Sequence, residues 1–245
     1  MSLTPTTHTY KTVGTCQIQA DVYQPTATAA PTPAIVHIHG GALINGSRQG
    51  VRLEQVERYL QAGYTVISID YRLAPESKLP AIMEDLQDAF RWVYGAGPAL
   101  LGIDPQRVAA VGHSAGGYLA LMAGGTVQPR PAALVAFYGY GDIVGDWYGK
   151  PSPYYCAHFP LISEAESGRA TIGPMCTAPY PGRGKEHFYL YCRQNGIWAK
   201  EVSGHDPHSE PDFFVPYCPV QTVTADYPAT LLLHGDQDTD VPYAQ

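Results

Sequence analysis

The sequence has few basic residues and no long apolar run. It holds 15 lysines and arginines among 245 residues, and its formal net charge is -7. This balance argues against a nucleic-acid-binding patch and against attachment to an anionic membrane surface. No apolar run approaches the roughly 20 residues of a membrane-spanning helix, and the first eight residues lack the features of a secretory signal peptide. We therefore expect a cytoplasmic protein whose partner is a small molecule, with no nucleic acid and no membrane span.

Cysteine is also scarce, with five residues in the chain. Their number is odd and their spacing is not that of paired metal ligands, so free thiols in a reducing compartment are expected. Four of the five lie in one region, which leaves a disulfide there open. We expect no metal and no cofactor. The cysteines are Cys16, Cys156, Cys176, Cys192 and Cys218.

Short apolar runs alternate with segments of helical periodicity. The strand candidates are residues 34–38, 64–69, 107–111, 133–137 and 229–233. Apolar residues recur at helical spacing in two of the intervening segments, which end near Gly63 and Gly95. This alternation predicts an α/β fold with a mostly parallel central sheet and helices on both faces. Ligands bind such sheets at the carboxyl ends of the strands, where the loops after Ile38, Val111 and Leu233 converge.

Residues 140–227 interrupt this alternation and are rich in tyrosine and proline. We expect a single domain over residues 1–245, in which 140–227 form a cap or lid inserted before the last strand. Its aromatic side chains would line a substrate pocket. An irregular surface excursion is the alternative interpretation.

The segment Gly112-His113-Ser114-Ala115-Gly116 has the form Gly-x-Ser-x-Gly. It follows the strand candidate 107–111 and precedes a predicted helix over 118–123. A serine on such a strand-to-helix turn is forced out of the sheet, and the glycines avoid steric clashes. Ser114 is therefore the candidate nucleophile, and the N–H of Ala115 is a candidate oxyanion donor. The alternative is a plain glycine-rich turn.

A second glycine-rich turn, His39-Gly40-Gly41-Ala42, follows the first clear strand. Acyl transfer needs backbone N–H donors aimed at the developing oxyanion, and small residues allow that backbone to approach the substrate. Gly41 and Ala42 are the candidate donors, together with Ala115. An ordinary strand-to-loop turn is the alternative.

Four motifs together resemble the α/β-hydrolase fold in order and spacing. They are His39-Gly40-Gly41, Asp70-Tyr71-Arg72-Leu73-Ala74-Pro75-Glu76, Gly112-His113-Ser114-Ala115-Gly116 and His234-Gly235-Asp236-Gln237-Asp238. The chain looks most like the hormone-sensitive-lipase-type esterases and the related acetyl-esterase and prolyl-oligopeptidase-like hydrolases, over residues of about 30–137 and 228–245. Ala42 departs from that lipase group, which usually has a third glycine there. An alanine N–H still serves as a donor.

The resemblance assigns further roles. It makes the segment from Asp70 to Glu76 mainly structural, and it selects Asp238 as the acid of a Ser-Asp-His triad. Asp236 and Asp240 are then expected to cap turns or face solvent. The family histidine lies about 25–35 residues after the acid, whereas this chain has no histidine after His234. We therefore expect a C-terminally incomplete chain with an uncovered apolar edge, and nearly no activity.

Other histidines are weaker candidates for the base. The side chain of His113 should point away from the Ser114 hydroxyl. His205 or His208 of the cap segment is an alternative base, and both with Asp206 are an alternative metal site.

The resemblance implies a carboxylic-ester hydrolase for short acyl groups, which acts through Ser114 and an acyl-enzyme. A peptidase or a carbohydrate acetyl esterase on the same fold is one alternative. A non-catalytic hydrolase-fold protein that binds a small molecule is another. The oligomeric state stays open.

Overall fold

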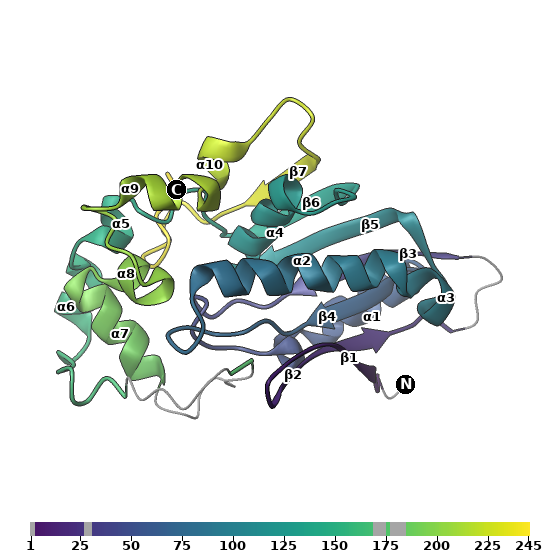
Figure 1. The fold of residues 1–245 in the computed structure, drawn as a ribbon, viewed down its shortest axis with the longest axis horizontal. Coiled ribbons are helices and arrows are strands. Elements are labelled where there is room, and N and C mark those ends of the chain that lie inside the picture. The colour runs from purple at the N-terminus through teal and green to yellow at the C-terminus, as the bar shows by residue number, and fades with distance from the viewer. Residues whose placement is uncertain (1–2, 27–30, 169–174, 177–184) are drawn as a thin grey trace.

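The computed structural model describes residues 3–26, 31–168, 175–176 and 185–245. Within these residues it contains a seven-stranded sheet in the order β1-β2-β4-β3-β5-β6-β7, with helices on both faces (Figure 1). The strands are β1 (Thr6–Val13), β2 (Cys16–Tyr23), β3 (Thr32–Ile38), β4 (Thr65–Ile69), β5 (Ile103–His113), β6 (Ala133–Phe137) and β7 (Ala229–Leu233). The five strands expected from the sequence are β3 to β7. The strands β1 and β2 were not expected.

The helices of the described residues fall into two groups. Those that flank the sheet are η1 (Arg48–Gly50), α1 (Leu53–Gln61), α2 (Leu79–Gly95), α3 (Gly97–Leu101) and α4 (Ala115–Thr126). The others follow β6 and are short: α5 (Asp146–Gly149), α6 (Pro153–His158), α7 (Lys185–Asn195), α8 (Trp198–Ser203), α9 (Pro211–Phe214), η2 (Val215–Tyr217) and α10 (Pro219–Thr222). Figure 1 shows α5 to α9 gathered beyond one end of the sheet.

The sheet is parallel from β4 to β7. The strand β3 lies between β4 and β5, and its Val36 is paired with Ile67 on one side and with Ala110 on the other. The hairpin β1–β2 is antiparallel and joins the sheet through β2 and β4. Strands in the middle of a parallel sheet are covered on both faces and therefore consist of apolar runs. For that reason β3, β4 and β5 were recognisable in the sequence.

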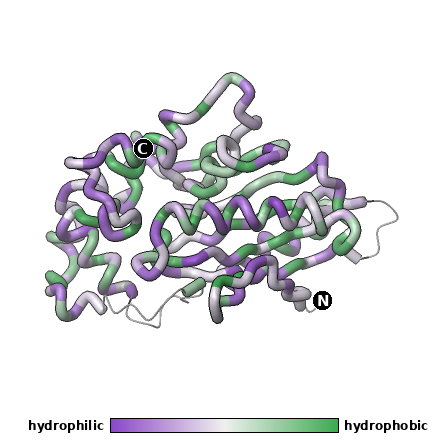
Figure 2. The backbone as a smooth tube through the Cα atoms, viewed as in Figure 1, coloured by the Kyte–Doolittle hydropathy of each residue, from purple (hydrophilic) through white to green (hydrophobic). Residues whose placement is uncertain are grey.

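Neighbouring residues of β4 pack into different cores. Ile67 belongs to the main core with α2 and α4, whereas Val66 packs in a smaller cluster with Val56 of α1. Successive side chains of a strand point to opposite faces, so α1 covers one face and α2 with α4 the other. Hydropathy alternates along α2 (Figure 2), whose buried side chains include Leu86 and Phe90. The expected fold class is thus the observed one.

The strand β7 lies at the edge of the sheet, and all of its residues are exposed. Leu231, Leu232 and Leu233 have exposed fractions of 54%, 65% and 41%. An apolar edge strand of this kind is open to pairing with another chain.

The segment Asp70 to Glu76 is held by buried ion pairs. Asp70 accepts hydrogen bonds from the backbone and the guanidinium of Arg48. Arg72 binds the buried carboxylate of Asp85 through its backbone N–H, Nε and Nη2. Glu76 pairs at 2.6 Å with Lys185, the first residue of α7. All three charged groups therefore have structural partners.

Candidate active site

The turn between β5 and α4 places Ser114 in a strained backbone conformation, with φ 53° and ψ -124°. A Cβ atom at Gly112 would lie 2.1 Å from the carbonyl oxygen of Gly116, and one at Gly116 would lie 2.0 Å from that of Ile38. The turn therefore requires both glycines. Ser114 precedes the first residue of α4, so the N–H of Ala115 lies at a helix N-terminus, where backbone donors have no helical partner.

The loop after β3 brings a second set of backbone donors to the same place. Gly41, Ala42 and Leu43 have positive φ angles of 115°, 56° and 61°. The carbonyl of Gly41 accepts hydrogen bonds from the N–H groups of Ile44 and Asn45, at 2.9 and 2.8 Å. These bonds close a tight turn after β3.

The indole of Trp198 is hydrogen-bonded to this loop. Its Nε1 donates a hydrogen bond of 3.0 Å to the carbonyl of Ala42. Trp198 is fully buried at the start of α8. The short helices that follow β6 therefore contact the loop that contains Gly41 and Ala42.

Ser114, Gly41 and Ala42 line one cavity of about 480 Å³. The residues after β6 contribute an aromatic and apolar wall to it, together with one carboxylate. These residues are Tyr155, Phe159, Tyr189, Leu190 and Asp240. Tyr155 belongs to α6, and Tyr189 and Leu190 belong to α7. Three aromatic residues of 140–227 thus line the cavity, and the role of this segment as a cap stays a prediction. Residues 169–174 and 177–184 lie outside the described residues.

The expected acid, Asp238, does not line this cavity. Its Oδ1 accepts hydrogen bonds from the N–H groups of Asp240 and Val241, and its Oδ2 is 3.6 Å from His234 Nε2. Its role as the acid stays a prediction. Asp240 was expected to cap a turn or face solvent; its side chain is 40% exposed, and the residue also lines the cavity and pairs with Arg193.

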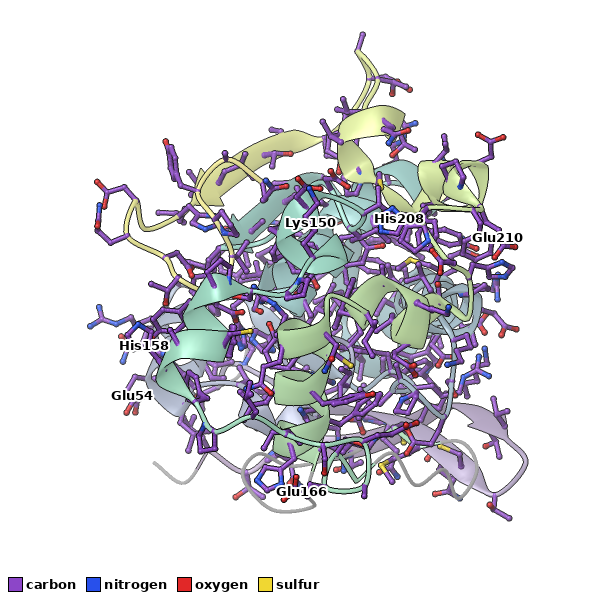
Figure 3. All side chains as sticks on the ribbon, turned by 90° about the vertical axis from the view of Figure 1, so that its left-hand side faces the viewer. Glu54, Lys150, His158, Glu166, His208 and Glu210 are labelled. Atoms are coloured by element: carbon purple, nitrogen blue, oxygen red, sulfur yellow. The ribbon has the colours of Figure 1, made fainter. Side chains whose placement is uncertain are left out.

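The two histidines considered as alternative bases, His205 and His208, lie away from the Ser114 cavity. His205 Nδ1 is 2.9 Å from Glu210 Oε1, and its ring stacks on Phe213. His208 is exposed, and Figure 3 shows it and Glu210 on the side of the molecule where α9 lies. Neither histidine lines the Ser114 cavity. Among the described residues no group of three metal-ligating side chains comes together, so the structure does not support a metal at His205, Asp206 and His208.

The surroundings of three histidines near the site lower their pKa values. Burial lowers the pKa of His37 to about 3 and that of His39 to about 4. Burial and the charge of Arg52 also lower the pKa of His113. The His113 ring contacts His37 and Tyr138. No described residue forms a hydrogen bond with Ser114 Oγ, so the structure places no imidazole on the candidate nucleophile.

The buried His37 makes stability depend on pH. Its folded-state pKa of about 3 lies below the ordinary value of 6.5, so unfolding below about pH 6.5 takes up a proton. We expect its contribution, complete above pH 6.5, to fall by about 2 kcal/mol at pH 5. The measurement is urea unfolding at pH 7 and pH 5. The loss should shrink in His37→Asn and persist in the exposed-site control His158→Asn. An equal loss in all three proteins would contradict this origin.

Comparison with known proteins places the chain in a family. The family model BD-FAE matches residues 20–142, half of the chain. The non-reducing polyketide synthase atr1 of Stereocaulon alpinum is 37% identical over 268 residues, which cover 96% of this chain and 11% of that protein. The synthase adrD of Penicillium rubens is 37% identical over 156 residues, which cover 58% of this chain and 6% of that protein. The chain thus spans only a small part of the length of these curated relatives.

Solved structures show the same fold. A protein of unknown function from Staphylococcus aureus superposes with a TM-score of 0.78 at 21% identity, covering 98% of this chain and 82% of that one. An α/β-hydrolase superfamily protein from Enterococcus faecalis gives 0.75 at 23% identity, covering 99% and 83%. A thermophilic esterase from Thermogutta terrifontis gives 0.64 at 24% identity, covering 98% and 73%.

No helix among the residues that the structure describes is long and apolar enough to span a membrane. The expected α/β-hydrolase fold is confirmed by the sheet and by the structural neighbours. With the family match over residues 20–142, the chain belongs to the BD-FAE family of α/β hydrolases.

Proposed function

We propose that the protein is a serine carboxylesterase-type hydrolase that acts on small esters through an acyl-enzyme. The observation that carries this proposal is the strained backbone of Ser114, in one cavity with Gly41 and Ala42. A serine held at a strand-to-helix turn next to backbone donors is an arrangement suited to acyl transfer.

In the proposed reaction the Ser114 hydroxyl attacks the ester carbonyl and its proton passes to a base. The N–H groups of Gly41, Ala42 and Ala115 stabilise the oxyanion of the tetrahedral intermediate. The alcohol leaves with a proton, and water then hydrolyses the acyl-enzyme to regenerate Ser114. Asp238 is the proposed acid that orients the base.

We infer from the size and lining of the cavity that the substrates are esters of short acyl groups. Its volume is about 480 Å³, and the cavity is lined by residues of the proposed donors and by residues of α6 and α7. We propose that the helices after β6 form a cap whose Tyr155, Phe159 and Tyr189 enclose the substrate. Their apolar surface excludes water from the reacting ester.

No imidazole of the described residues is hydrogen-bonded to Ser114. We therefore expect slow turnover, and we expect an added base to increase the rate. Ser114 without a base keeps the pKa of an alcohol and is a weak nucleophile, so the described chain should hydrolyse p-nitrophenyl butyrate little faster than its Ser114→Ala variant. Added imidazole should raise the wild-type rate above that of the variant by tenfold or more, since loss of a triad member costs about 10⁴ in rate.

The rate is followed as p-nitrophenolate release over a range of imidazole concentrations. The Ser114→Ala variant in the same imidazole solutions corrects for direct hydrolysis by imidazole. Fast Ser114-dependent turnover without imidazole would show that the chain supplies its own base. Equal rates for wild type and variant at every concentration would refute Ser114 as the nucleophile and favour a non-catalytic binding protein.

Thioesters are a second candidate substrate class. The observation that favours them is the similarity of 96% of this chain to part of a polyketide synthase, because polyketide intermediates are carried as acyl thioesters. Parallel assays with butyryl-N-acetylcysteamine, acetylated xylose and an alanine p-nitroanilide distinguish a thioesterase, a carbohydrate acetyl esterase and a peptidase from the carboxylesterase.

A further inference from the structure

A buried arginine connects the cap to the loop after β7. Arg193 lies in the last turn of α7, and its side chain is 3% exposed. Its Nη1 donates hydrogen bonds to Asp240 Oδ1 and to the Tyr189 hydroxyl, and its Nη2 donates to the Asp240 carbonyl at 3.1 Å. Tyr189 donates in turn to Asp240 Oδ1 at 2.6 Å. Asp240 therefore receives donors on its carboxylate and on its backbone.

Aromatic rings surround the guanidinium. Its carbon lies 4.8 Å from the ring centroid of Tyr155 and 4.9 Å from that of Tyr148. A cation at such distances from aromatic rings is stabilised by their quadrupoles. A buried charge without a partner is very costly, and these rings and Asp240 offset the cost of burying Arg193.

The two charges of this pair are not equally accessible. The Asp240 side chain is 40% exposed, and it lines the Ser114 cavity, whereas Arg193 does not. A ligand in the cavity can therefore contact Asp240, whose position is fixed by hydrogen bonds from the buried Arg193. The cavity wall next to it is formed by Tyr155 and Tyr189.

The donors that hold Asp240 keep their protons. Burial and the charge of Asp240 raise the pKa of Tyr189 well above its ordinary value. Burial acts to lower the pKa of Arg193, but Tyr189, Tyr148 and Asp240 outweigh it, so that pKa is raised. Both groups donate at every physiological pH, and the carboxylate stays oriented.

We propose that Asp240 is the specificity-determining residue of the cavity, which accepts a hydrogen bond from a hydroxyl or ammonium group of the substrate. This inference rests on the proposed ester hydrolysis. The ester carbonyl binds at Gly41, Ala42 and Ala115, and the donor group lies at the cap side of the cavity. A carboxylate on the same part of the substrate is repelled by Asp240.

The test is a set of four acetate esters that differ only at the far end of a butyl chain: butyl acetate, 4-hydroxybutyl acetate, 4-aminobutyl acetate and 4-acetoxybutanoate. Dissociation constants are measured by ligand-observed NMR with the full chain carrying Ser114→Ala, so that no ester is consumed. We expect the hydroxyl or the ammonium ester to bind at least about fivefold more tightly than butyl acetate, as for a hydrogen bond to a charged acceptor. The carboxylate ester should bind at least about fivefold more weakly than butyl acetate.

Variants of the loop after β7 test whether Asp240 causes this order of affinities. Asp240→Asn in the same background loses the charge but keeps an acceptor oxygen. It should bring the ammonium and carboxylate esters to within about twofold of butyl acetate, while Asp240→Glu should keep the order. Asp236→Asn is the matched control, because Asp236 is an exposed carboxylate of the same loop outside the cavity lining. The hydroxyl and ammonium arms distinguish a polyol-like from a cationic substrate.

The Ser114→Ala protein with an intact Asp240 already tests the proposal. Equal affinity for the four esters, or no detectable binding of any of them, overturns it. Unchanged discrimination between the ammonium and carboxylate esters in Asp240→Asn overturns it as well. Because binding is measured without turnover, failure of this inference differs from failure of the proposed hydrolysis, which shows as Ser114-independent rates in the imidazole assay.

Discussion

Replacing Gly116 by alanine is expected to abolish folding or to lower the free energy of unfolding by about 3 kcal/mol or more. The new Cβ atom would lie 2.0 Å from the carbonyl oxygen of Ile38 and 2.7 Å from that of His39. Both are backbone atoms at the end of β3 and the start of the loop that follows it, and they cannot rotate away as a side chain does. Relief requires α4 to move away from β3, which breaks the packing of the buried helix.

Gly125 of the same helix is the matched control for this prediction. A Cβ atom there would have its nearest neighbour at 3.7 Å, which is ordinary contact. Gly125→Ala should therefore be neutral or stabilise the protein by up to about 1 kcal/mol, since alanine restricts the unfolded chain. Urea unfolding followed by circular dichroism measures both variants. Similar stability of the two variants would show that the turn is not sterically closed at Gly116.

Loss of the Asp85 charge is the second large effect. Its fully buried carboxylate accepts hydrogen bonds from the backbone N–H, Nε and Nη2 of Arg72, and it pairs with Lys11 at 2.8 Å. Arg72 keeps its pair with the exposed Glu84 at 2.8 Å, and Lys11 keeps its pair with Asp88 at 2.6 Å. Both cations nevertheless lose their one fully buried partner, and breaking a buried ion pair typically costs about 3–5 kcal/mol. We expect Asp85→Asn to destabilise the protein by such an amount.

The control for Asp85 is the exposed pair of Asp146 and Lys150. Their side chains are 79% and 64% exposed, and solvent-exposed ion pairs contribute little. Asp146→Asn should leave the urea midpoint unchanged within error. If Asp85→Asn has an equally small effect, the ion pairs of Arg72 do not hold the loop after β4.

The hairpin β1–β2 shows why part of the fold was missed. Four of the eight residues of β1 are exposed, and the strand consists largely of threonine and other polar residues. Such an edge strand lacks the continuous apolar run that identified β3 to β6. Its signals were the β-branched residues and the two-residue connection Gly14-Thr15 between Val13 and Cys16. A search for hairpins as well as buried strands would have found it.

Some residues of the candidate site could likewise be predicted from the sequence, and others could not. Ser114 and the Gly41–Ala42 turn were recognisable because each depends on a local backbone conformation that glycine makes possible. Asp240 was not recognisable, since its partner Arg193 is 47 residues away in the chain. No periodicity or motif relates two such positions.

The sequence by itself determined the apolar strands of the parallel core and the glycine-rich turns at Ser114 and at Gly41–Ala42, because short segments carry those conformations. Only the tertiary structure decided which side chains share a cavity. Packing of the short helices after β6 against the carboxyl ends of the strands places Tyr155, Tyr189 and Asp240 in one cavity with Ser114 and leaves Asp238 outside its lining. Contacts between segments distant in sequence depend on how whole elements pack, and local sequence preferences do not encode them.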